Sequence, residues 1–254
     1  MSERTRAEVE ADEVSFFNRY YQSRAYNDLG WRLRIDREVA NIQRVAGGKK
    51  LNRVLSLGCG DGQFEIALAR QVGHVTALDI SDEAIELAKR QMTLAGVTNV
   101  DFRCLPMAEL KWEQGFDAVI CLAFLHHVRP TDLPGILGTS ARALAPGGFF
   151  YSQDPNIHGF MRWLGRKTLG QKDYDKYHSP DERELDPAEL EADLRKAGFG
   201  QVQIGYIDVT LIPALFVLKN GPSWPLRFCP PFDWLWCHSP FARWASGFYT
   251  VARR

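Results

Sequence analysis

A turn built on alternating glycines divides an apolar run from a helical pattern near residue 58. Residues 54–57 read Val-Leu-Ser-Leu, and such a run is typical of a strand covered on both faces of a parallel sheet. Gly58, Gly60 and Gly62 follow at alternate positions, where glycine allows unusual backbone angles and lets a ligand approach the main chain. The helix expected over 63–71 directs its unpaired N–H groups at this turn. The stretch therefore predicts a strand, a ligand-binding turn and a helix in succession.

The spacing of the turn and the strand that follows it narrow the class of ligand. The pattern G-x-G-x-G differs from the G-x-G-x-x-G fingerprint of dinucleotide-binding turns. A second predicted strand, 74–80, carries Asp79 near its C-terminal end. A carboxylate at that position suits a ribose, because it accepts hydrogen bonds from the two ribose hydroxyls. We therefore expect a ligand that contains a ribose.

Two further landmarks come in the order of a known enzyme family. Residues 116–121 form an apolar strand pattern that leads into Leu125-His126-His127-Val128, and Pro146-Gly147-Gly148 precedes another strand pattern. Together with the glycine turn and the acid after it, these motifs resemble the class I S-adenosylmethionine-dependent methyltransferases over roughly residues 50 to 205. The family often has an acid two residues before the first glycine, where this chain has Ser56. That departure affects one expected contact to the methionine end of the cofactor.

The resemblance implies an α/β fold that is Rossmann-like and doubly wound. Its mostly parallel seven-stranded sheet would carry a C-terminal antiparallel hairpin, with additional N-terminal helices. The alternation of strand and helix patterns in the sequence agrees with such a sheet, and Ser81 and Gly96 are placed to cap and end the second helix. The predicted strands are 53–57, 74–80, 99–104, 117–123, 148–153, 201–209 and 247–252. The predicted helices are 63–71, 82–95, 131–144 and one that starts at Asp186.

Length bounds the domain organisation. A chain of 254 residues is long enough for one sizeable core with added segments. We divide it into an N-terminal helical lid at 1–46 and a methyltransferase domain at 47–254, with insertions at 154–180 and 211–245. Four aromatic residues of the first segment fit a lid over the cofactor and plain packing on the domain equally well: Tyr20, Tyr21, Tyr26 and Trp31.

Charge, cysteine content and the distribution of apolar residues argue against nucleic-acid binding, secretion and a transmembrane segment. Lys and Arg number 31, as do Asp and Glu, so the chain lacks the basic footprint of a nucleic-acid-binding protein. Five cysteines without a C-x-x-C pair indicate reduced thiols and a cytoplasmic protein. The charged N-terminus does not resemble a signal peptide, and the longest apolar stretch, 209–218, is too short for a transmembrane segment.

The segment 211–245 is unusually rich in aromatic residues. It holds four of the seven tryptophans, with four phenylalanines, several prolines and three basic residues. One interpretation is an irregular cap that packs on the domain. The other is an apolar docking surface for a lipid-like substrate, a peripheral membrane contact or a partner chain. The composition supports both interpretations.

The resemblance also implies which residues hold S-adenosylmethionine, whose product after transfer is S-adenosylhomocysteine. Asp79 would bind the ribose, and Ile80 would pack on the adenine. Backbone groups around Met107 would read the adenine edge, because Pro106 has no hydrogen-bond donor. The full expected set is Gly58, Cys59, Gly60, Gly62, Asp79, Ile80, Pro106, Met107, Cys121 and Leu122.

Three residues after the fourth and fifth predicted strands are candidate catalytic groups: His126, His127 and Asp154. A neutral imidazole near pH 7 accepts a proton from a hydroxyl as its oxygen attacks, and Asp154, just past the fifth predicted strand, is a second candidate base. In the alternative interpretation, the histidines cap local backbone or hold the carboxylate of the cofactor. A divalent metal bound by these three residues would lack a fourth protein ligand, so no metal site is expected.

These patterns predict S-adenosylmethionine-dependent methyl transfer to an oxygen or nitrogen of a small, partly apolar molecule. A natural product, a lipid-like molecule or a sugar-bearing one would fit. The cofactor supplies the leaving group, so the protein mainly supplies position and a dry site. Two other classes are a non-catalytic cofactor-binding or interaction protein and a nicotinamide-dependent oxidoreductase, although the G-x-G-x-G spacing disfavours the latter. The patterns fix neither the acceptor nor the oligomeric state.

Overall fold

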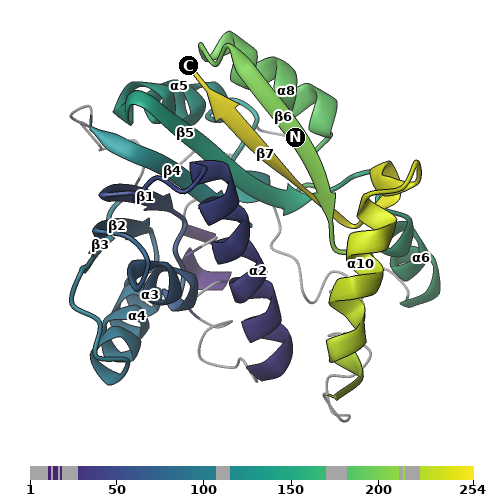
Figure 1. Ribbon diagram of the computed structural model, residues 1–254, viewed down its shortest axis with the longest axis horizontal. Coiled ribbons are helices and arrows are strands. Elements are labelled where there is room, and N and C mark those ends of the chain that lie inside the picture. Colours follow the sequence, from purple (N-terminus) through teal and green to yellow (C-terminus); the bar gives the residue numbers. More distant parts are fainter. Residues whose placement is uncertain are drawn as a thin grey trace.

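The computed structural model of the chain describes residues 11–12, 14–16, 18, 28–106, 115–169, 182–211, 214 and 224–254. These residues contain a seven-stranded sheet with the order β3-β2-β1-β4-β5-β7-β6 (Figure 1). Its strands are β1 (Arg53–Leu57), β2 (His74–Asp79), β3 (Val100–Cys104), β4 (Phe116–Leu122), β5 (Leu144–Pro155), β6 (Gln201–Ile207) and β7 (Gly247–Arg253). Strands β1 to β5 pair in parallel, and β7 runs antiparallel to both of its neighbours. The predicted parallel sheet with a C-terminal antiparallel hairpin is therefore confirmed.

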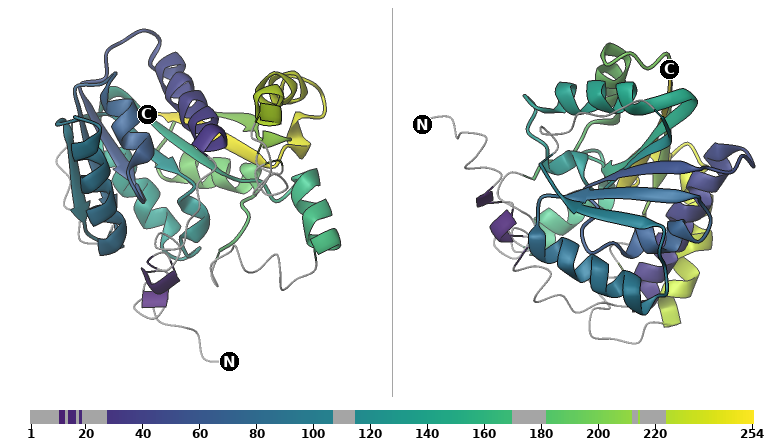
Figure 2. Two further views of the ribbon diagram at one scale, coloured as in Figure 1. Left: turned by 90° about the horizontal axis from the view of Figure 1, so that it is seen from below. Right: turned by 90° about the vertical axis from the view of Figure 1, so that its left-hand side faces the viewer.

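Helices cover both faces of the sheet, as a doubly wound fold requires. The helices α2, α3 and α4 lie on one face, and α5 and α8 lie on the other (Figures 1 and 2). The helices are α2 (Asp28–Ala46), α3 (Gln63–Ala69), α4 (Asp82–Leu94), α5 (Leu133–Ala143), α6 (Phe160–Leu169), α8 (Pro187–Lys196) and α10 (Cys229–Cys237). The described residues also contain the short 3-10 turns η2 (Leu125–His127), η3 (Trp224–Phe228) and η4 (Ala242–Trp244).

Alternate residues of the central strands point into two separate hydrophobic cores. In β5, Phe149 and Tyr151 pack with α2 and α3, whereas Phe150 packs with α5 and α8. In β1, Val54 belongs to the first core and Leu55 to the second. Because successive side chains of a strand point to opposite faces, continuous apolar runs are needed here, and the sequence supplies them.

The predicted helix caps are present. Ser81 caps α4, since its Oγ accepts a hydrogen bond from the Ala84 N–H at 3.0 Å, and Gly96 ends that helix with a φ of +64°. Asp186 caps α8 by accepting a hydrogen bond from the Ala188 N–H at 2.8 Å. Local sequence signals therefore set where these helices begin and end.

The fifth strand is longer than the sequence pattern indicated. The prediction was 148–153, but β5 pairs with β7 as far as Pro155, which lies opposite Gly247. Asp154 therefore lies inside β5 and not just past it, because the antiparallel partner continues the ladder beyond the parallel neighbour β4. The polar segment after it also contains a helix, α6.

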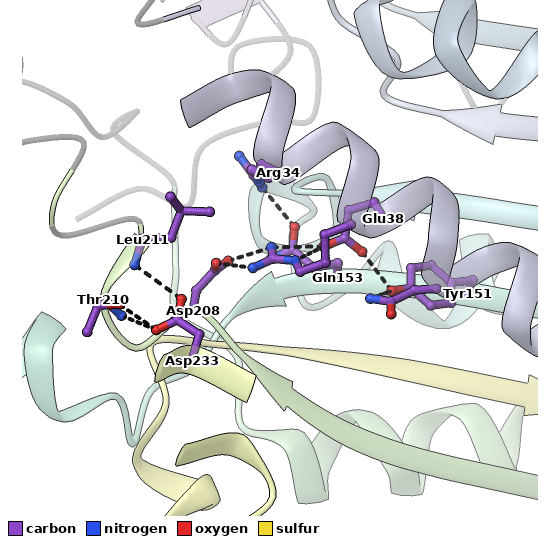
Figure 3. Close-up of polar contacts among 10 residues, drawn as sticks. Arg34, Glu38, Tyr151, Gln153, Asp208, Thr210, Leu211 and Asp233 are labelled. Atoms are coloured by element: carbon purple, nitrogen blue, oxygen red, sulfur yellow. Dashed lines mark hydrogen bonds and ion pairs between the residues drawn. The ribbon is translucent and has the colours of Figure 1, made fainter. Parts of the chain in front are cut away.

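A buried polar network ties α2 to the far half of the sheet (Figure 3). The Arg37 guanidinium bonds Glu38 on its own helix at 2.9 Å and Asp208 after β6 at 3.1 Å. Burial would lower the pKa of Arg37, but the two carboxylates outweigh it and raise that pKa. Glu38 also accepts a hydrogen bond from the buried Tyr151 hydroxyl at 2.7 Å. The network fixes the position of α2 against β5.

The N-terminal half of α2 reaches the C-terminal end of β5. The Arg34 guanidinium donates to Gln153 Oε1 at 2.8 Å and lies 5.2 Å from the centre of the Trp31 ring. The other aromatic residues named for a lid, Tyr20, Tyr21 and Tyr26, lie outside the described residues. The division into a lid and a domain stays a prediction. Within the described residues, no helix combines the length and the apolar character that crossing a membrane requires.

Candidate active site

The glycine turn joins β1 to α3 and is held against β2. Gly58, Gly60 and Gly62 all have positive φ angles, of +70°, +54° and +74°. The N–H groups of Gly58 and Cys59 both donate to the Leu78 carbonyl, at 2.8 and 2.9 Å. A Cβ added at Gly58 would lie 2.3 Å from the ring of Phe124. Glycine is therefore required here both by the backbone angles and by the close approach of an aromatic ring.

Asp79 connects the glycine turn to the start of α4. Its Oδ2 accepts a hydrogen bond from the Gly60 N–H at 2.8 Å, and its Oδ1 accepts one from the Ser81 N–H at 3.0 Å. Burial raises the pKa of Asp79, and these backbone donors act against that rise. Each carboxylate oxygen keeps acceptor capacity for a second donor, so the group is oriented by the protein and can still accept from a ribose. Ile80 follows it and is half-buried.

The other predicted cofactor residues lie at neighbouring strand ends. Pro106 follows β3 and is half-buried, whereas Met107 lies outside the described residues. At the end of β4, Cys121 is fully buried and Leu122 is half-buried. Burial raises the pKa of the Cys121 thiol well above its usual value, so this cysteine is protonated and unsuited to act as a nucleophile.

A buried carboxylate that the sequence reading missed lies beside the glycine turn. Glu65, in the first turn of α3, accepts a hydrogen bond from the Ser56 hydroxyl at 2.6 Å. Burial raises the pKa of Glu65 to about 8, and the nearby Asp61 and Asp79 carboxylates add to the rise. Among the described residues, its Oε2 has no hydrogen-bond partner. The acid missing at Ser56 is thus replaced by one that reaches the same place from the helix.

His126 and Asp154 form a buried hydrogen-bonded pair. The Nδ1 atom of His126 lies 2.9 Å from Asp154 Oδ1, and the same oxygen accepts from the His126 backbone N–H at 3.2 Å. Burial raises the pKa of Asp154 to about 7, while the His126 N–H and the charge of His127 oppose that rise. Such a pair fixes the ring and makes Nε2 the nitrogen that exchanges a proton. The two residues are 28 positions apart, and sequence spacing did not indicate that they pair.

His127 and Glu182 complete the polar end of the site. The rings of His126 and His127 have centroids 4.0 Å apart, and His126 Nε2 lies 3.8 Å from Glu182 Oε1. One ligand atom from each of these three residues lies within 4.8 Å of the others, a donor set that also suits a divalent cation. The metal considered from the sequence had Asp154 in place of Glu182, but Asp154 binds Nδ1 of His126. The expectation of no metal stays a prediction.

All these groups meet at one edge of the sheet. The glycine turn, Asp79, Leu122 and Asp154 lie at the C-terminal ends of β1, β2, β4 and β5, respectively. These four strands are neighbours in the sheet, in the order β2-β1-β4-β5. Parallel α/β sheets bind ligands in the crevice outside these strand ends. A charge on His127 lowers the pKa of both Asp79 and Asp154, so the cofactor half and the histidine half of the site are electrostatically connected.

Comparison with known proteins identifies the family. A methyltransferase-domain family model matches residues 54–148. The chain is 32% identical over 209 residues to the ubiquinone biosynthesis O-methyltransferase of Bordetella bronchiseptica, with 77% of both chains covered. The chain belongs to the class I S-adenosylmethionine-dependent methyltransferases. It is also 36% identical over 160 residues to the protein of the same name from Xylella fastidiosa, where the match covers 58% of this chain and 60% of that protein.

A solved structure extends the likeness in fold to nearly the whole methyltransferase. The DhpI–SAH complex superposes with a TM-score of 0.60 at 20% sequence identity and covers 98% of both chains. The cofactor is S-adenosylmethionine, and the site fits it. The Asp61 and Asp79 carboxylates lie close enough to Glu65 to raise its pKa, and such a group of acids suits a ligand that carries positive charge on its sulfonium and ammonium groups. The positive φ angles at the glycine turn leave its backbone approachable.

Proposed function

We propose that this methyltransferase transfers the methyl group to a hydroxyl oxygen of a small, partly apolar acceptor. The observation that carries the proposal is the contact of 2.9 Å between His126 Nδ1 and Asp154 Oδ1. A histidine oriented by a buried carboxylate is suited to take a proton from a hydroxyl. An amine acceptor that is already neutral needs no such base, so the pair favours oxygen over nitrogen.

The chemistry divides simply between cofactor and protein. When bound, the cofactor supplies an activated methyl group with a built-in leaving group. His126 takes the hydroxyl proton at Nε2 as the acceptor oxygen becomes nucleophilic. Asp154 keeps the ring oriented and stabilises the imidazolium that results. Asp79 and the glycine turn would hold the cofactor at the strand ends, next to the histidine side of the site.

A phenolic hydroxyl is the acceptor group that this base suits best. Ordinary phenols have a pKa of about 10 and ordinary imidazoles one of about 6.5, so a histidine is the side chain best matched to take a proton near neutral pH from a phenol that still holds it. The Bordetella and Xylella relatives are named as O-methyltransferases, which supports an oxygen acceptor. The half-buried ring of Phe124, which contacts Gly58, offers an apolar wall to an aromatic acceptor.

The division of the chain that the sequence suggested fits this function. In our proposal, residues 1–46 form a lid and residues 47–254 the catalytic domain, with the acceptor lying under the segments 154–180 and 211–245. The hydrogen bond from Arg34 to Gln153 holds helix α2 next to the residue that precedes Asp154, which supports this proposal. A lid there would exclude water during transfer.

The test uses matched acceptors that differ only in the receiving atom. The enzyme is incubated with deuteromethyl-labelled cofactor and either a substituted catechol or the corresponding aniline in which amino groups replace both hydroxyls, and the products are identified by mass spectrometry. We expect a labelled methyl group on the catechol oxygen and little transfer to the aniline. Transfer to the aniline alone, or hydroxyl transfer that persists at full rate in His126→Ala, would overturn the proposal.

A further inference from the structure

Helix α10 is inverted with respect to the usual distribution of polar and apolar residues. Its carboxylate, Asp233, is only 5% exposed, whereas Trp234 and Leu235 beside it are each 63% exposed and Phe232 is 48% exposed. Soluble proteins normally bury large apolar side chains and expose carboxylates. Helix α10 departs from both rules, because it buries a carboxylate and exposes large apolar side chains. The burial of Asp233 therefore needs an explanation.

The buried carboxylate anchors α10 to the body of the protein (Figure 3). Asp233 Oδ1 accepts hydrogen bonds from the backbone N–H and the hydroxyl of Thr210, each at 2.7 Å, and Oδ2 accepts from the Leu211 N–H at 3.2 Å. These donors lie just after β6, where the chain has left the sheet and its backbone N–H groups need other partners. With Asp233 turned inward, the helix geometry turns Trp234 and Leu235 outward.

The aromatic side chains of this segment, most of them exposed, are ordered by contacts with one another. Ring contacts run in sequence from Phe232 to Trp236, then Phe241 and Trp244, with centroid distances of 6.1, 5.9 and 5.5 Å. The Trp236 indole N–H donates to the Phe241 carbonyl at 3.1 Å, which fixes α10 against η4. The result is a preformed apolar surface over η3, α10 and η4, which we call the aromatic face.

The charges on the aromatic face have one sign. Arg227 and Arg243 are exposed, and Arg243 lies 5.4 Å from the centre of the Trp244 ring. Asp233 is the single acidic residue among 224–245, and it is buried in the anchor. Outward-facing charge in this segment is therefore positive. Exposed tryptophan and phenylalanine together with arginine are complementary to the headgroup region of an anionic bilayer.

The aromatic face stands at the same edge of the sheet as the active site. Strand β6 runs in the direction of β5 because both are antiparallel to β7, so its C-terminal end lies at the edge where the other C-terminal strand ends lie. Helix α10 is anchored just past that end, through Asp233 and Thr210 (Figure 1). The Asn156 side chain, just after β5, donates to the carbonyls of Arg243 and Ala245 at 3.0 and 2.8 Å. The segment that follows Asp154 is thereby joined to η4.

We propose that the aromatic face docks this methyltransferase on anionic lipid bilayers, with the active-site edge of the sheet turned toward the membrane. Trp234 and Leu235 enter the interface, while Arg227 and Arg243 contact lipid phosphates. A bilayer is the occupant that both features need, since it supplies an apolar layer directly beneath a negatively charged one. The proposal does not depend on the identity of the acceptor.

The test is vesicle co-sedimentation of the full chain without acceptor. The vesicles contain either phosphatidylcholine alone or phosphatidylcholine with phosphatidylglycerol. We expect binding to the anionic vesicles and a loss of at least about tenfold in Trp234→Ala/Leu235→Ala, because two large apolar side chains no longer enter the interface. Leu94→Ala is the matched control, since Leu94 is 88% exposed on the distant helix α4, and it should bind like the unmodified protein.

A second variant separates charge from apolar insertion. Arg227→Gln/Arg243→Gln should weaken binding to anionic vesicles by about fivefold per arginine and leave binding to phosphatidylcholine unchanged. Absence of binding to both vesicle types overturns the proposal, as does binding that both double variants retain. Self-association that Trp234→Ala/Leu235→Ala abolishes, with no vesicle binding, also overturns it and makes a second copy the occupant. Turnover of a water-soluble catechol without vesicles reports on the proposed function separately.

Discussion

The substitution Asp154→Asn tests how much the buried carboxylate contributes to proton transfer. Asparagine keeps the size of the side chain and can still accept from the His126 backbone N–H. It removes the negative charge that lies 2.9 Å from the imidazole. The imidazolium formed when the acceptor loses its proton would then be buried without a counter-charge. We therefore expect the chemical step to slow while the fold and the cofactor half of the site stay intact.

The size of the effect follows from the burial of the pair. His126 is 5% exposed and Asp154 is fully buried, and removing one partner of a buried ion pair costs about 3–5 kcal/mol. At 1.36 kcal/mol per factor of ten, this corresponds to a decrease of about 10²–10⁴ in kcat. Rapid-quench single turnover with saturating labelled cofactor measures that step directly, and calorimetry should show affinity for S-adenosylhomocysteine within about twofold of the original.

The pH profile provides the second half of this test. Burial raises the pKa of Asp154 to about 7, so the carboxyl is neutral at lower pH and ionised at higher pH. A neutral carboxyl cannot stabilise the imidazolium, and the rate should therefore rise as the pH increases through about 7. Asp154→Asn should lose this dependence. Asp186→Asn is the matched control, because Asp186 contacts His158 at 3.2 Å on the surface. Unchanged single-turnover rates in Asp154→Asn would refute the reasoning.

Three further outcomes are expected. Burial raises the pKa of Glu65 from 4.5 to about 8, so its contribution to the free energy of unfolding is present below pH 4.5 and is lost as the pH rises to about 8, by about 3–5 kcal/mol. Urea unfolding at a series of pH values should show this decrease in the original protein and not in Glu65→Gln. The same dependence on pH in both proteins would contradict the expectation. Chelation by EDTA should leave turnover unchanged. A loss of turnover that added Mg²⁺ or Zn²⁺ restores would instead indicate a metal site at His126, His127 and Glu182. Arg37→Met should lower the melting temperature by about 6–20 °C because it leaves the buried carboxylates of Glu38 and Asp208 without the positive charge of Arg37. Arg103→Met, in an exposed pair, should cost less than about 1 kcal/mol.

Local patterns were sufficient to predict the glycine turn, the position of Asp79 and the helix cap at Ser81. The turn at Gly58, the acid at Asp79 and the caps of α4 depend on neighbouring residues in the sequence, and the structure has them where they were expected. The prediction that Asp154 lies just past the fifth strand was wrong, because β5 extends to Pro155 through its pairing with β7. That partner is about a hundred residues away in the chain.

The polar pairs could not be predicted because burial decides them. Glu65 resembles an ordinary polar residue in the first turn of a helix, and only the fold places it against Ser56. His126 and Asp154 were both named as candidates, but nothing in the sequence indicated that they bond each other. Asp233 is the clearest case. A sequence rule would expose Asp233 and bury Trp234. In the structure Asp233 is buried because it accepts from the backbone N–H groups of Thr210 and Leu211, just after β6.

The most direct test of the proposed base compares acceptors whose hydroxyls differ in acidity. His126→Ala and the unmodified enzyme, each with labelled cofactor bound, are mixed with a series of phenols at fixed pH, and single-turnover rates are recorded. A phenol that is already ionised needs no base. The account therefore predicts a large loss of rate in His126→Ala, about 10²–10⁴, for weakly acidic phenols and a loss that vanishes for acidic ones. The same loss for every phenol in the series would contradict it.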